Sequence, residues 1–570
     1  MSKPIYILGT SNSHDGSSCL MKDGEIVVAI EKERLTKIKH DGFDDNETID
    51  YCLSSSGITA NDLDLVVFED SMNFRHKESD IKKVGKRNIP PNIPTLSISH
   101  HLAHAYSAIG MSPFEETAVL VIDGQGGSVD KCLDYNNCKC MPSEYHDLGG
   151  NKEDYWEYIS YYEFSNGVIK PLFKDFAKFN QEFRKKHFCA PEDMEHSVGE
   201  FYDGISNYIF NKRFSDGKTM GLAPYGRKNV FFHDAFDFFD LRVRNRKDWY
   251  GDFPNFRAGR FQGLYEGFQY FSDIAFWAQS QLEKAVVFSA RTLNELSDSK
   301  NLSYAGGVAL NAVANPKIIE NTSFEDIFIQ PAAADNGLSI GCCYYGWLEH
   351  FGKKKVKHKK SVYLGREYTS DNILNEIKKH QDLSYMKSKN IAKNAADLLQ
   401  EGNVIAWFQG GSEFGPRALG NRSILADPRK KDVRNYINRS VKHREDFRPF
   451  APSILEDQLH NFFDCKFVRS PHMLQVAKAK PGISEIIPAV VHVDGTSRVQ
   501  TVSQRDNTLY AQLISEFSKI SGIPILLNTS LNGANMPIVE TPKDAVEFFR
   551  TVKNLDYLII GDFIVKRGDL

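Results

Sequence analysis

Two apolar runs, far apart in the chain, each end on a single aspartate next to a glycine-containing turn. The runs are TAVLVIDGQGG at residues 117–127 and DIFIQPAAADNG at residues 326–337, and their acids are Asp123 and Asp335. A strand that is buried on both faces carries no polar group until its end, and such strands occur in parallel sheets covered by helices. In open α/β sheets, the residues after the carboxyl ends of the strands line a cleft. The two runs therefore predict an α/β fold in which both aspartates point into a cleft.

The first forty residues predict strands joined by tight turns. The apolar segments PIYILGT at 4–10 and SSCLMKDGEIVVAIEKER at 17–34 follow each other, and Lys22-Asp23-Gly24 lies within the second, as in a hairpin turn. The loop between the segments carries His14. Apolar residues at helical spacing over 279–296 and 391–402 add helices to both halves of the chain.

Size and charge narrow the class of protein. At 570 residues the chain exceeds one ordinary core, and 41% hydrophobic with 25% charged residues is typical of a soluble globular protein. The 74 acidic and 70 basic residues give a net charge of -4, which excludes a global basic field for nucleic acid. The start of the chain lacks the apolar region of a signal peptide, and no run approaches the roughly 20 apolar residues of a membrane helix. We expect a monomer or homodimer with neither a membrane nor a nucleic-acid partner.

The nine cysteines are odd in number and scattered, which indicates reduced thiols in a cytoplasm. Only Cys132, Cys138 and Cys140 lie close together in the sequence. Their C-x5-C-x-C spacing lacks the paired C-x2-C units of zinc sites. An irregular surface insertion is therefore favoured over a structural metal.

A basic run divides the chain. Seven of the eight residues from Lys353 to Lys360 are basic, and such a block is more often a solvated linker than a phosphate-binding surface. We therefore expect two units, residues 1–360 and 361–570. The second has its own apolar segments, at 403–411, 450–456 and 523–532.

The segment SISHHLAHAYSA at 97–108 contains three histidines. If a helix begins after Ser99, His100 and His104 lie one turn apart on one face, about 5 to 6 Å apart at Cβ, whereas His101 points elsewhere. Alone, such a pair is more often two polar residues on a part-exposed helix. Together with the strand-end acids Asp123 and Asp335, it would form a mixed nitrogen and oxygen site that suits iron, manganese or zinc.

Two basic segments form a second group of candidate site residues. QGGSEFGPRALGNRSILADPR at 409–429 presents Arg417 and Arg422 among glycines, and NRSVKHREDFRPFAPS at 438–453 follows it. The basic residues of this second segment are Arg439, Lys442, Arg444 and Arg448. Guanidinium groups on a glycine-rich loop are suited to grip an anion, and buried cations require anionic partners. A phosphate-rich ligand is favoured over a solvated basic face.

Two glycine turns precede helices, AGGVALNAVANP at 305–316 and GKTMGLAPYG at 217–226. Gly306 and Gly307 would let a flat ring or a phosphate approach the backbone closely. Neither segment matches the dinucleotide or P-loop fingerprints. On spacing alone, each is a glycine turn before a helix.

In this order, nine segments resemble the O-carbamoyltransferase family of antibiotic and nodulation-factor biosynthesis, of the NodU/CmcH type, which includes the tobramycin carbamoyltransferase. The resemblance covers the chain from about residue 5 to its C-terminus. The segments are HDGSSCLMKDGEIVVAIEKERLTKIKH, SHHLAHAYSA, VIDGQG, GKTMGLAPYG, GGVALNAVANP, PAAADNG, EFGPRALGNRSILADPR, REDFRPFAPS and LLNTSLN.

The resemblance implies a duplicated actin-like nucleotide-binding domain (ASKHA fold, similar to the tRNA threonylcarbamoyl transferases), which is α/β, followed by a YrdC-like α+β domain. The second domain would form carbamoyl adenylate from carbamoyl phosphate and ATP with Mg2+, releasing pyrophosphate. The first would pass the carbamoyl group to a hydroxyl of a small-molecule acceptor such as an antibiotic, a toxin or a sugar-like compound. A divalent metal, Fe2+ before Mn2+ or Zn2+, would support this transfer.

The resemblance also assigns residues to roles. The metal shell would be His100, His104, Asp123 and Asp335, and His14 and Lys39 would lie near the adenylate, with His14 as the base. The nucleotide contacts of the first domain would be Lys218, Gly306, Gly307 and Asn311. The basic clamp of the second would comprise Arg417, Lys442, Arg444, Arg448 and Arg498, with Asn528 and Ser530 in the LNTS loop.

This sequence departs from the family pattern in two places. Residues 128–160 are longer and more irregular than expected, which puts any family acid after DGQG in doubt, and Tyr225 stands in APYG where relatives often have histidine. Two alternatives stay open. One is a tRNA-modifying threonylcarbamoyl transferase, against which the acidic net charge argues. The other is a nucleotide-binding regulator without turnover, because fold does not fix function.

Overall fold

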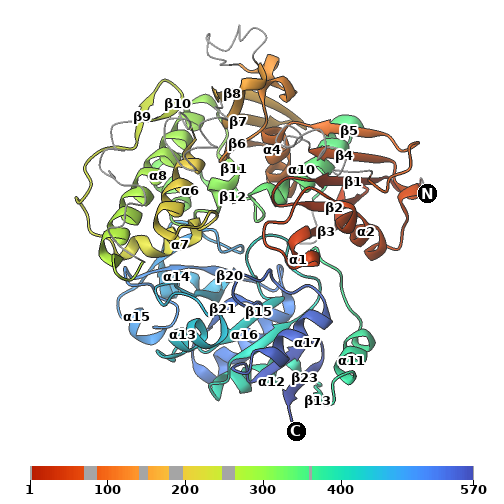
Figure 1. The fold of residues 1–570 in the computed structure, drawn as a ribbon, viewed down its shortest axis with the longest axis vertical. Helices are drawn as coiled ribbons and strands as arrows, with labels where there is room; N and C mark the ends of the chain where they lie inside the picture. Colours follow the sequence, from red (N-terminus) through yellow and green to blue (C-terminus); the bar gives the residue numbers. More distant parts are fainter. Residues whose placement is uncertain are drawn as a thin grey trace. The chain divides into compact units, whose positions relative to one another are not determined.

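A computed structural model of the 570-residue chain describes residues 3–69, 87–139, 152–178, 197–246, 264–357 and 362–568. The chain forms two compact units (Figure 1). The first comprises Met1–Glu25, Gly42–Leu53 and Gly57–His358, and the second comprises Ile26–Asp41, Ser54–Ser56 and Lys359–Leu570. The division differs from two contiguous units because two short early segments join the second unit.

The first sheet has the strand order β3-β2-β1-β4-β5. Its strands are β1 Tyr6–Ser11, β2 Ser17–Lys22, β3 Glu25–Glu31, β4 Leu65–Glu69 and β5 Thr95–Ile98. β2 pairs antiparallel with β1, whereas β4 is parallel to β1 and β5 is parallel to β4. Asp23 and Gly24 both have positive φ between β2 and β3, which confirms the predicted hairpin turn.

The second sheet repeats this topology. Its order is β12-β11-β6-β7-β8, and its strands are β6 Thr117–Ile122, β7 Tyr155–Ser165, β8 Val168–Lys178, β11 Asn301–Ala305 and β12 Asp326–Ile329. β6, β7 and β8 form an antiparallel meander, and β11 and β12 continue parallel to β6. In both sheets, the first strand pairs antiparallel with the next strand of the meander on one side and parallel with a later strand on the other. The first unit therefore has the duplicated actin-like α/β fold that the resemblance implies.

Helices accompany the sheets of the first unit. They are α2 Asn46–Ser55, α4 His100–Met111, α6 Val198–Phe210, α7 Asp216–Leu222, α8 Phe268–Leu296, α9 Asn315–Asn321 and α10 Leu338–Tyr345. A two-stranded ribbon, β9 Phe236–Phe239 and β10 Arg242–Asn245, lies in the same unit. Helices α4 and α10 pack closely, because a Cβ at Gly341 would lie 1.8 Å from the carbonyl oxygen of Ala103. This contact fixes α4, which carries the histidine cluster.

The second unit is built on a mixed eight-stranded sheet of order β13-β23-β22-β14-β15-β21-β16-β20. Its strands are β13 Leu383–Lys387, β14 Ile405–Phe408, β15 Arg422–Ala426, β16 Ala451–Leu455, β20 Gln500–Val502, β21 Ile525–Ser530, β22 Tyr557–Ile560 and β23 Phe563–Arg567. A smaller sheet contains β17 Phe463–Asp464, β18 Val476–Ala479 and β19 Thr496–Arg498. This mixed pairing is the α+β class that the resemblance implies, and the three predicted segments form β14, β16 and β21.

The helices of the second unit are α1 Lys32–Thr36, α11 Ser370–Lys378, α12 Ile391–Gln400, α13 Val433–Tyr436, α14 Leu459–Phe462, α15 Ile483–Ile486, α16 Thr508–Ser521 and α17 Pro542–Thr551. Leu399 of α12 and Phe517 of α16 pack into one core with Trp407 of β14, and all three side chains are fully buried. Among the helices that the structure describes, none is long and apolar enough to cross a membrane.

Two side chains of the segment Ile26–Asp41, Glu31 and Arg34, bind a residue of the second unit, which explains why the segment belongs to that unit. Glu31 accepts a hydrogen bond of 2.7 Å from the backbone N–H of Gly415, and Arg34 donates one of 2.7 Å to the carbonyl oxygen of the same residue. Glu31 and Arg34 also form a buried ion pair at 2.6 Å. Glu31 and Arg34 therefore bind both the backbone N–H and the carbonyl oxygen of Gly415, in the glycine-rich loop that carries Arg417.

Candidate functional site

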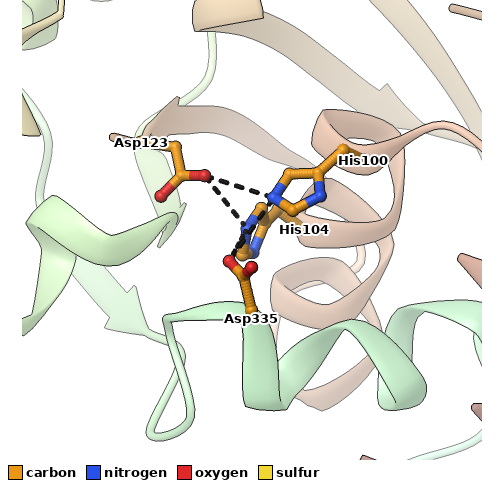
Figure 2. Close-up of side chains that lie close together, drawn as sticks. All are labelled: His100, His104, Asp123 and Asp335. Carbon is orange, nitrogen blue, oxygen red and sulfur yellow. Dashed lines mark hydrogen bonds and ion pairs between the residues drawn. The ribbon is translucent and has the colours of Figure 1, made fainter. Parts of the chain in front are cut away.

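Four side chains converge in the first unit, as Figure 2 shows. His100 Nε2 lies 3.2 Å from Asp123 Oδ2 and 3.4 Å from Asp335 Oδ1, and His104 Nε2 lies 3.8 Å from the same two oxygens. One ligand atom from each residue lies within 4.8 Å of the others, and all four residues are buried. The structure thus brings together the four residues that the sequence pattern singled out as a metal shell.

Local structure explains this convergence. His100 and His104 occupy the first turns of α4, one turn apart. Asp123 follows β6 directly, and Asp335 begins a short 3-10 turn after β12. The backbone N–H of Gly307 donates a 2.9 Å hydrogen bond to Asp123 Oδ1, which leaves Oδ2 for the histidines. Gly306 has φ +91°, and a Cβ there would lie 2.3 Å from the carbonyl oxygen of Ile122, so glycine is required at this approach.

The charges of the four side chains depend on one another. Burial opposes the charge of His100, but Asp335 and Glu69 outweigh it and raise the pKa of His100 well above its usual value. Burial would likewise raise the pKa of Asp123, but the hydrogen bond with His100 outweighs it and lowers this pKa to about 2. A divalent ion would replace the protons that now balance the two carboxylates.

His104 shows that the group fits a metal. Its side chain is fully buried, and within the described part of the chain neither ring nitrogen has a hydrogen-bond partner. A buried imidazole without hydrogen bonds is costly, whereas a neutral imidazole nitrogen is a good ligand for a transition metal. Two imidazoles and two carboxylates suit Fe2+, Mn2+ or Zn2+.

His14 lies beside this group and is connected to it through Asp335. Its Nδ1 is 3.1 Å from Asp335 Oδ2, and Ser13 also donates its hydroxyl to that oxygen. Burial disfavours the charged imidazole, but Asp335 and Asp15 outweigh it and raise the pKa of His14 to about 9. The ring of Phe214 stacks on His14, with 5.2 Å between the centroids. His14 thus contacts one of the four candidate ligands directly.

The N-terminus of α4 is capped from a neighbouring strand. Ser99 occupies the N-cap position, as expected, but its side chain caps no backbone group. Instead the backbone N–H of His101 donates to Glu157 Oε2 at 3.4 Å, and the His101 ring bonds Ser160. Buried Lys174 binds the other oxygen of Glu157. His101 therefore contacts Glu157 and Ser160 and belongs to a different set of contacts from His100 and His104.

Cys132 also joins this network. Its Sγ lies 3.0 Å from Asp134 Oδ1 and 3.3 Å from Glu157 Oε1, and Lys174 Nζ lies 3.0 Å from the same Asp134 oxygen. Since the Lys174 ammonium lies between these two carboxylates, it supplies the positive charge that a metal would bring. Cys138 is partly exposed, and Cys140 lies outside the described residues.

Cations gather in the second unit. They are Arg417, Lys442, Arg444, Arg448 and Arg498, to which we refer as the cation cluster. Burial lowers the pKa of each, and for most the charges of neighbouring members lower it further. Nε of Arg417 and Nε of Arg498 are buried without a hydrogen-bond partner among the described residues. A bound anion would stabilise cations that lower one another's pKa, so the cluster suits a phosphate-rich ligand.

Lys442 lies at the centre of contacts with the LNTS loop. Its Nζ donates to the carbonyl oxygen of Ser530 at 2.7 Å, to that of Asn532 at 2.9 Å and to the side chains of both. Lys39 belongs to the second unit, and its charge contributes to the lowered pKa of Lys442. Lys39 therefore lies near the cation cluster, although its place in the sequence suggested the first domain.

Several residues that the sequence indicated as binding candidates have contacts within the protein. Arg422 is fully buried and donates to the carbonyl oxygens of Gln409, Gly410 and Glu540, so its guanidinium group stabilises the loop and is not an anion grip. Arg439 forms an exposed ion pair with Asp446. The spacing of residues in the sequence did not indicate these carbonyl and carboxylate partners.

The amides show the same pattern. Asn528 donates to Ser453 and to Gln500 within the sheet. Asn311 exchanges two 3.0 Å hydrogen bonds with the amide of Gln279. Lys218 lies over the ring of Phe210, 5.3 Å from its centroid. Among the nucleotide contacts predicted for the first unit, only the glycine turn contacts the metal group, through the hydrogen bond from Gly307 to Asp123.

Sequence reasoning missed Glu69. This fully buried carboxylate ends β4 and lies 3.2 Å from His100 Nδ1. The signal was present, because the segment LVVFE at 65–69 is an apolar run that ends on an acid, as the runs before Asp123 and Asp335 are. It also missed Asn532, since nothing in LNTSLN distinguishes the residue that binds Lys442.

Known proteins resemble this chain over most of its length. A family model described as carbamoyltransferase N-terminus matches residues 6–87 and 73–344, and one described as carbamoyltransferase C-terminus matches residues 396–567. The nodulation protein NolNO of Sinorhizobium fredii is 33% identical over 97% of this chain and 79% of its own length. The nodulation protein NolO of Bradyrhizobium diazoefficiens is 34% identical over 82% of this chain and 79% of its own. Among solved structures, full-length HypF in a phosphate- and nucleotide-bound form is 12% identical, with a TM-score of 0.38 over 62% of this chain and 57% of that one.

Proposed function

Since the chain belongs to the carbamoyltransferase family, we propose that it is an ATP-dependent O-carbamoyltransferase that works through carbamoyl adenylate. The observation that carries this proposal is the pairing of chemistries within one chain. The second unit holds a partly buried cluster of cations that lower one another's pKa, and the first holds a compact group of two histidines and two aspartates. Adenylate formation needs the cations, and transfer to a hydroxyl suits the histidine and aspartate group.

The cation cluster supports the adenylation step. Carbamoyl phosphate, ATP and water would give carbamoyl adenylate, pyrophosphate and orthophosphate, with the carbamate oxygen displacing pyrophosphate at the α-phosphorus. Both substrates are polyanions that repel each other, and negative charge develops on the leaving pyrophosphate. Fixed cations in a water-poor site offset both effects without reorganisation. Arg417, Arg448 and Arg498 are the members that we expect to contact phosphate oxygens, with Mg2+ bound to ATP.

The histidine and aspartate group supports the transfer step. His100, His104, Asp123 and Asp335 would hold the metal, Fe2+ before Mn2+ or Zn2+. When bound, such an ion acts as a Lewis acid toward a carbonyl or phosphoryl oxygen. His14 would accept the proton of the attacking hydroxyl in its neutral form, since its imidazole lies next to the group and is partly exposed. This form requires that a bound cation offset the charge of Asp335, which raises the pKa of His14. The hydroxyl oxygen would form a bond to the carbamoyl carbon, and AMP would leave.

The acceptor would be a hydroxyl of a natural product, such as an antibiotic, a toxin or a sugar-like compound. Two of the relatives are named as nodulation proteins, which fits secondary metabolism. We place the reaction in the cytoplasm, because the nine cysteines of the chain are odd in number and those that the structure describes are free thiols.

Pyrophosphate release tests the proposal. The protein, loaded with Fe2+ and incubated with ATP and Mg2+, should release pyrophosphate only when carbamoyl phosphate is present. Arg448→Ala should abolish this release, whereas His100→Ala should leave it largely intact and stop carbamoyl transfer. Arg439→Ala is the matched control, because it removes an arginine of the same segment whose ion pair is exposed. A folded and metal-loaded protein that releases no pyrophosphate in response to carbamoyl phosphate would refute the proposal.

A further inference from the structure

We propose that Glu69 is a positioning residue for the metal group: its carboxylate accepts the Nδ1 proton of His100 and thereby directs Nε2 of that ring to the metal. The inference rests on the metal group of the proposed function. Glu69 contacts Nδ1 of His100, whereas Asp123 and Asp335 contact Nε2 of the same ring, so Glu69 acts through His100. The role is therefore distinct from that of the four candidate ligands.

The geometry of His100 supports this role. Glu69 Oε1 lies 3.2 Å from Nδ1 on one edge of the ring, and the oxygens of Asp123 and Asp335 lie 3.2 and 3.4 Å from Nε2 on the other. A neutral imidazole carries its proton on one nitrogen only and binds a metal through the other. A carboxylate on Nδ1 can only accept, so it holds the proton there and leaves the Nε2 lone pair for the ion.

Glu69 is held on a rigid support. It is the last residue of β4, which lies between β1 and β5 in the sheet. In the register, Glu69 pairs with Ser11 of β1 and with Ile98 of β5, two residues before His100. Its side chain is fully buried. Because both neighbouring strands fix its backbone, the carboxylate has little freedom to leave the ring of His100.

His104 provides an internal comparison. Its Nδ1 has no hydrogen-bond partner among the described residues, so no side chain there selects its tautomer. Partners behind a ligating histidine orient the ring and make it more basic, and their loss typically weakens metal binding about 10- to 100-fold. We therefore expect His100 to be the preformed ligand and His104 to adjust when the metal binds.

Metal affinity tests this inference without turnover. The metal-free protein is titrated with Mn2+, and binding is followed by electron paramagnetic resonance of the free ion. Glu69→Gln keeps an oxygen that can accept from Nδ1 but removes the charge, and Glu69→Leu removes both. We expect about 10-fold weaker binding for the first and a loss nearer 100-fold for the second. Glu163→Gln is the control, because Glu163 lies in the same unit and accepts from Ser297, away from the metal group.

A spectroscopic measurement separates positioning from a loss of stability. In the Mn2+-saturated protein, electron spin echo modulation from imidazole nitrogen should report two histidines in the wild type, and the contribution of one should weaken in Glu69→Leu. If Glu69→Leu does not fold, Glu69→Gln carries the test alone. Affinities within twofold of wild type for the folded variants, or an equal loss in Glu163→Gln, would overturn the inference.

The outcome also separates this inference from the proposed function. If the wild type binds no Mn2+, the metal group and the role of Glu69 fail together, whereas pyrophosphate release by the second unit can still succeed. If the wild type binds Mn2+ but releases no pyrophosphate, adenylation fails and the role of Glu69 stands or falls on the affinities alone.

Discussion

Lys442 binds the loop that contains Ser530 through both the carbonyl oxygen, at 2.7 Å, and the hydroxyl, at 3.1 Å. Two further contacts go to Asn532. The donors of this ammonium are thus occupied by the protein, and the lysine holds the loop in place while its charge remains within the cation cluster. A substitution at Lys442 should affect both the position of the loop and the charge of the site.

Lys442→Met should lower carbamoyl-phosphate-dependent pyrophosphate release about 100- to 1,000-fold, the range found when one preorganised group that stabilises a transition state is removed. Ser530→Ala should lower it less, because the carbonyl oxygen of residue 530 remains. Initial rates at saturating ATP measure both effects. Equal losses in the two variants would show that the hydroxyl of Ser530, rather than the cation, is the group that matters.

The pH dependence of stability should reveal the lowered pKa of Lys442. Burial and the charges of Arg444 and Arg448 hold the pKa of Lys442 well below its usual value in the folded protein. Between the folded pKa and about 10.4, the unfolded chain binds more protons at this site than the folded chain does, so the free energy of unfolding should rise with pH across that window. Thermal midpoints in steps of pH should show this slope.

Pyrophosphate should reduce that slope, because a bound anion favours the charged form of Lys442. The thermal midpoint should therefore gain more from pyrophosphate at the acidic end of the window than at the alkaline end. Lys442→Met serves as the control and should flatten the slope. A slope that is unchanged in this variant would assign the effect to other groups.

A metal should stabilise the first unit measurably. A ligand that binds only the folded state at 100 times its dissociation constant adds about 2.7 kcal/mol to the free energy of unfolding. Mn2+ should therefore raise the thermal midpoint of the chelator-treated protein, and His104→Ala should remove most of that increase. The gain should be smaller at acidic pH, because Asp335 and Glu69 raise the pKa of His100 and its proton competes with the ion. Equal gains in wild type and His104→Ala would exclude this group as the site.

Sequence periodicity was sufficient to predict that two histidines and two aspartates converge. An apolar run that ends on an acid indicates a strand end, and two histidines one turn apart share a helix face, so the pattern identified His100, His104, Asp123 and Asp335. The duplication of the sheets was not visible in this way, because the helices α6, α7 and α8 and the β9–β10 ribbon lie between the meander and the strands β11 and β12.

Other features depend on contacts that no local pattern encodes. The segment around Glu31 and Arg34 looked like part of the first domain, yet these side chains bind the backbone of Gly415. Arg422 and Arg417 are neighbours on one glycine-rich loop, and only the fold decides that carbonyl oxygens surround the former while the latter keeps a buried nitrogen without a partner. Charge in the sequence indicates cations but not which of them are held by hydrogen bonds within the protein.

The buried ion pair of Glu31 and Arg34, which binds Gly415, should contribute to the free energy of unfolding. Arg34→Met would leave the Glu31 carboxylate buried without its cation, which costs about 3–5 kcal/mol in comparable buried pairs. Hydrogen exchange of core amides in the second unit should report this loss. The double variant Glu31→Gln with Arg34→Met should recover much of it, because the charge is gone while an oxygen can still accept from Gly415. A double variant as unstable as Arg34→Met would contradict the explanation by buried charge.

Phe214 should control access to His14. Its φ of +56° is in the left-handed region, which is unfavourable for a bulky residue by about 1–2 kcal/mol, and Asp203 holds it there by accepting from its backbone N–H at 2.8 Å. Phe214→Gly relieves this strain but removes the ring that stacks on His14. The variant should therefore be at least as stable as the wild type, while His14 becomes more exposed to solvent.

Chemical modification can measure this exposure without an acceptor substrate. Diethyl pyrocarbonate should modify His14 several times faster in Phe214→Gly than in the wild type at the same pH, as judged by peptide mass spectrometry. Phe214→Tyr is the matched control, because it keeps the aromatic ring and should leave the rate unchanged. If His14 reacts at the same rate in all three proteins, the ring does not shield the imidazole. The strained backbone at residue 214 would then need another explanation.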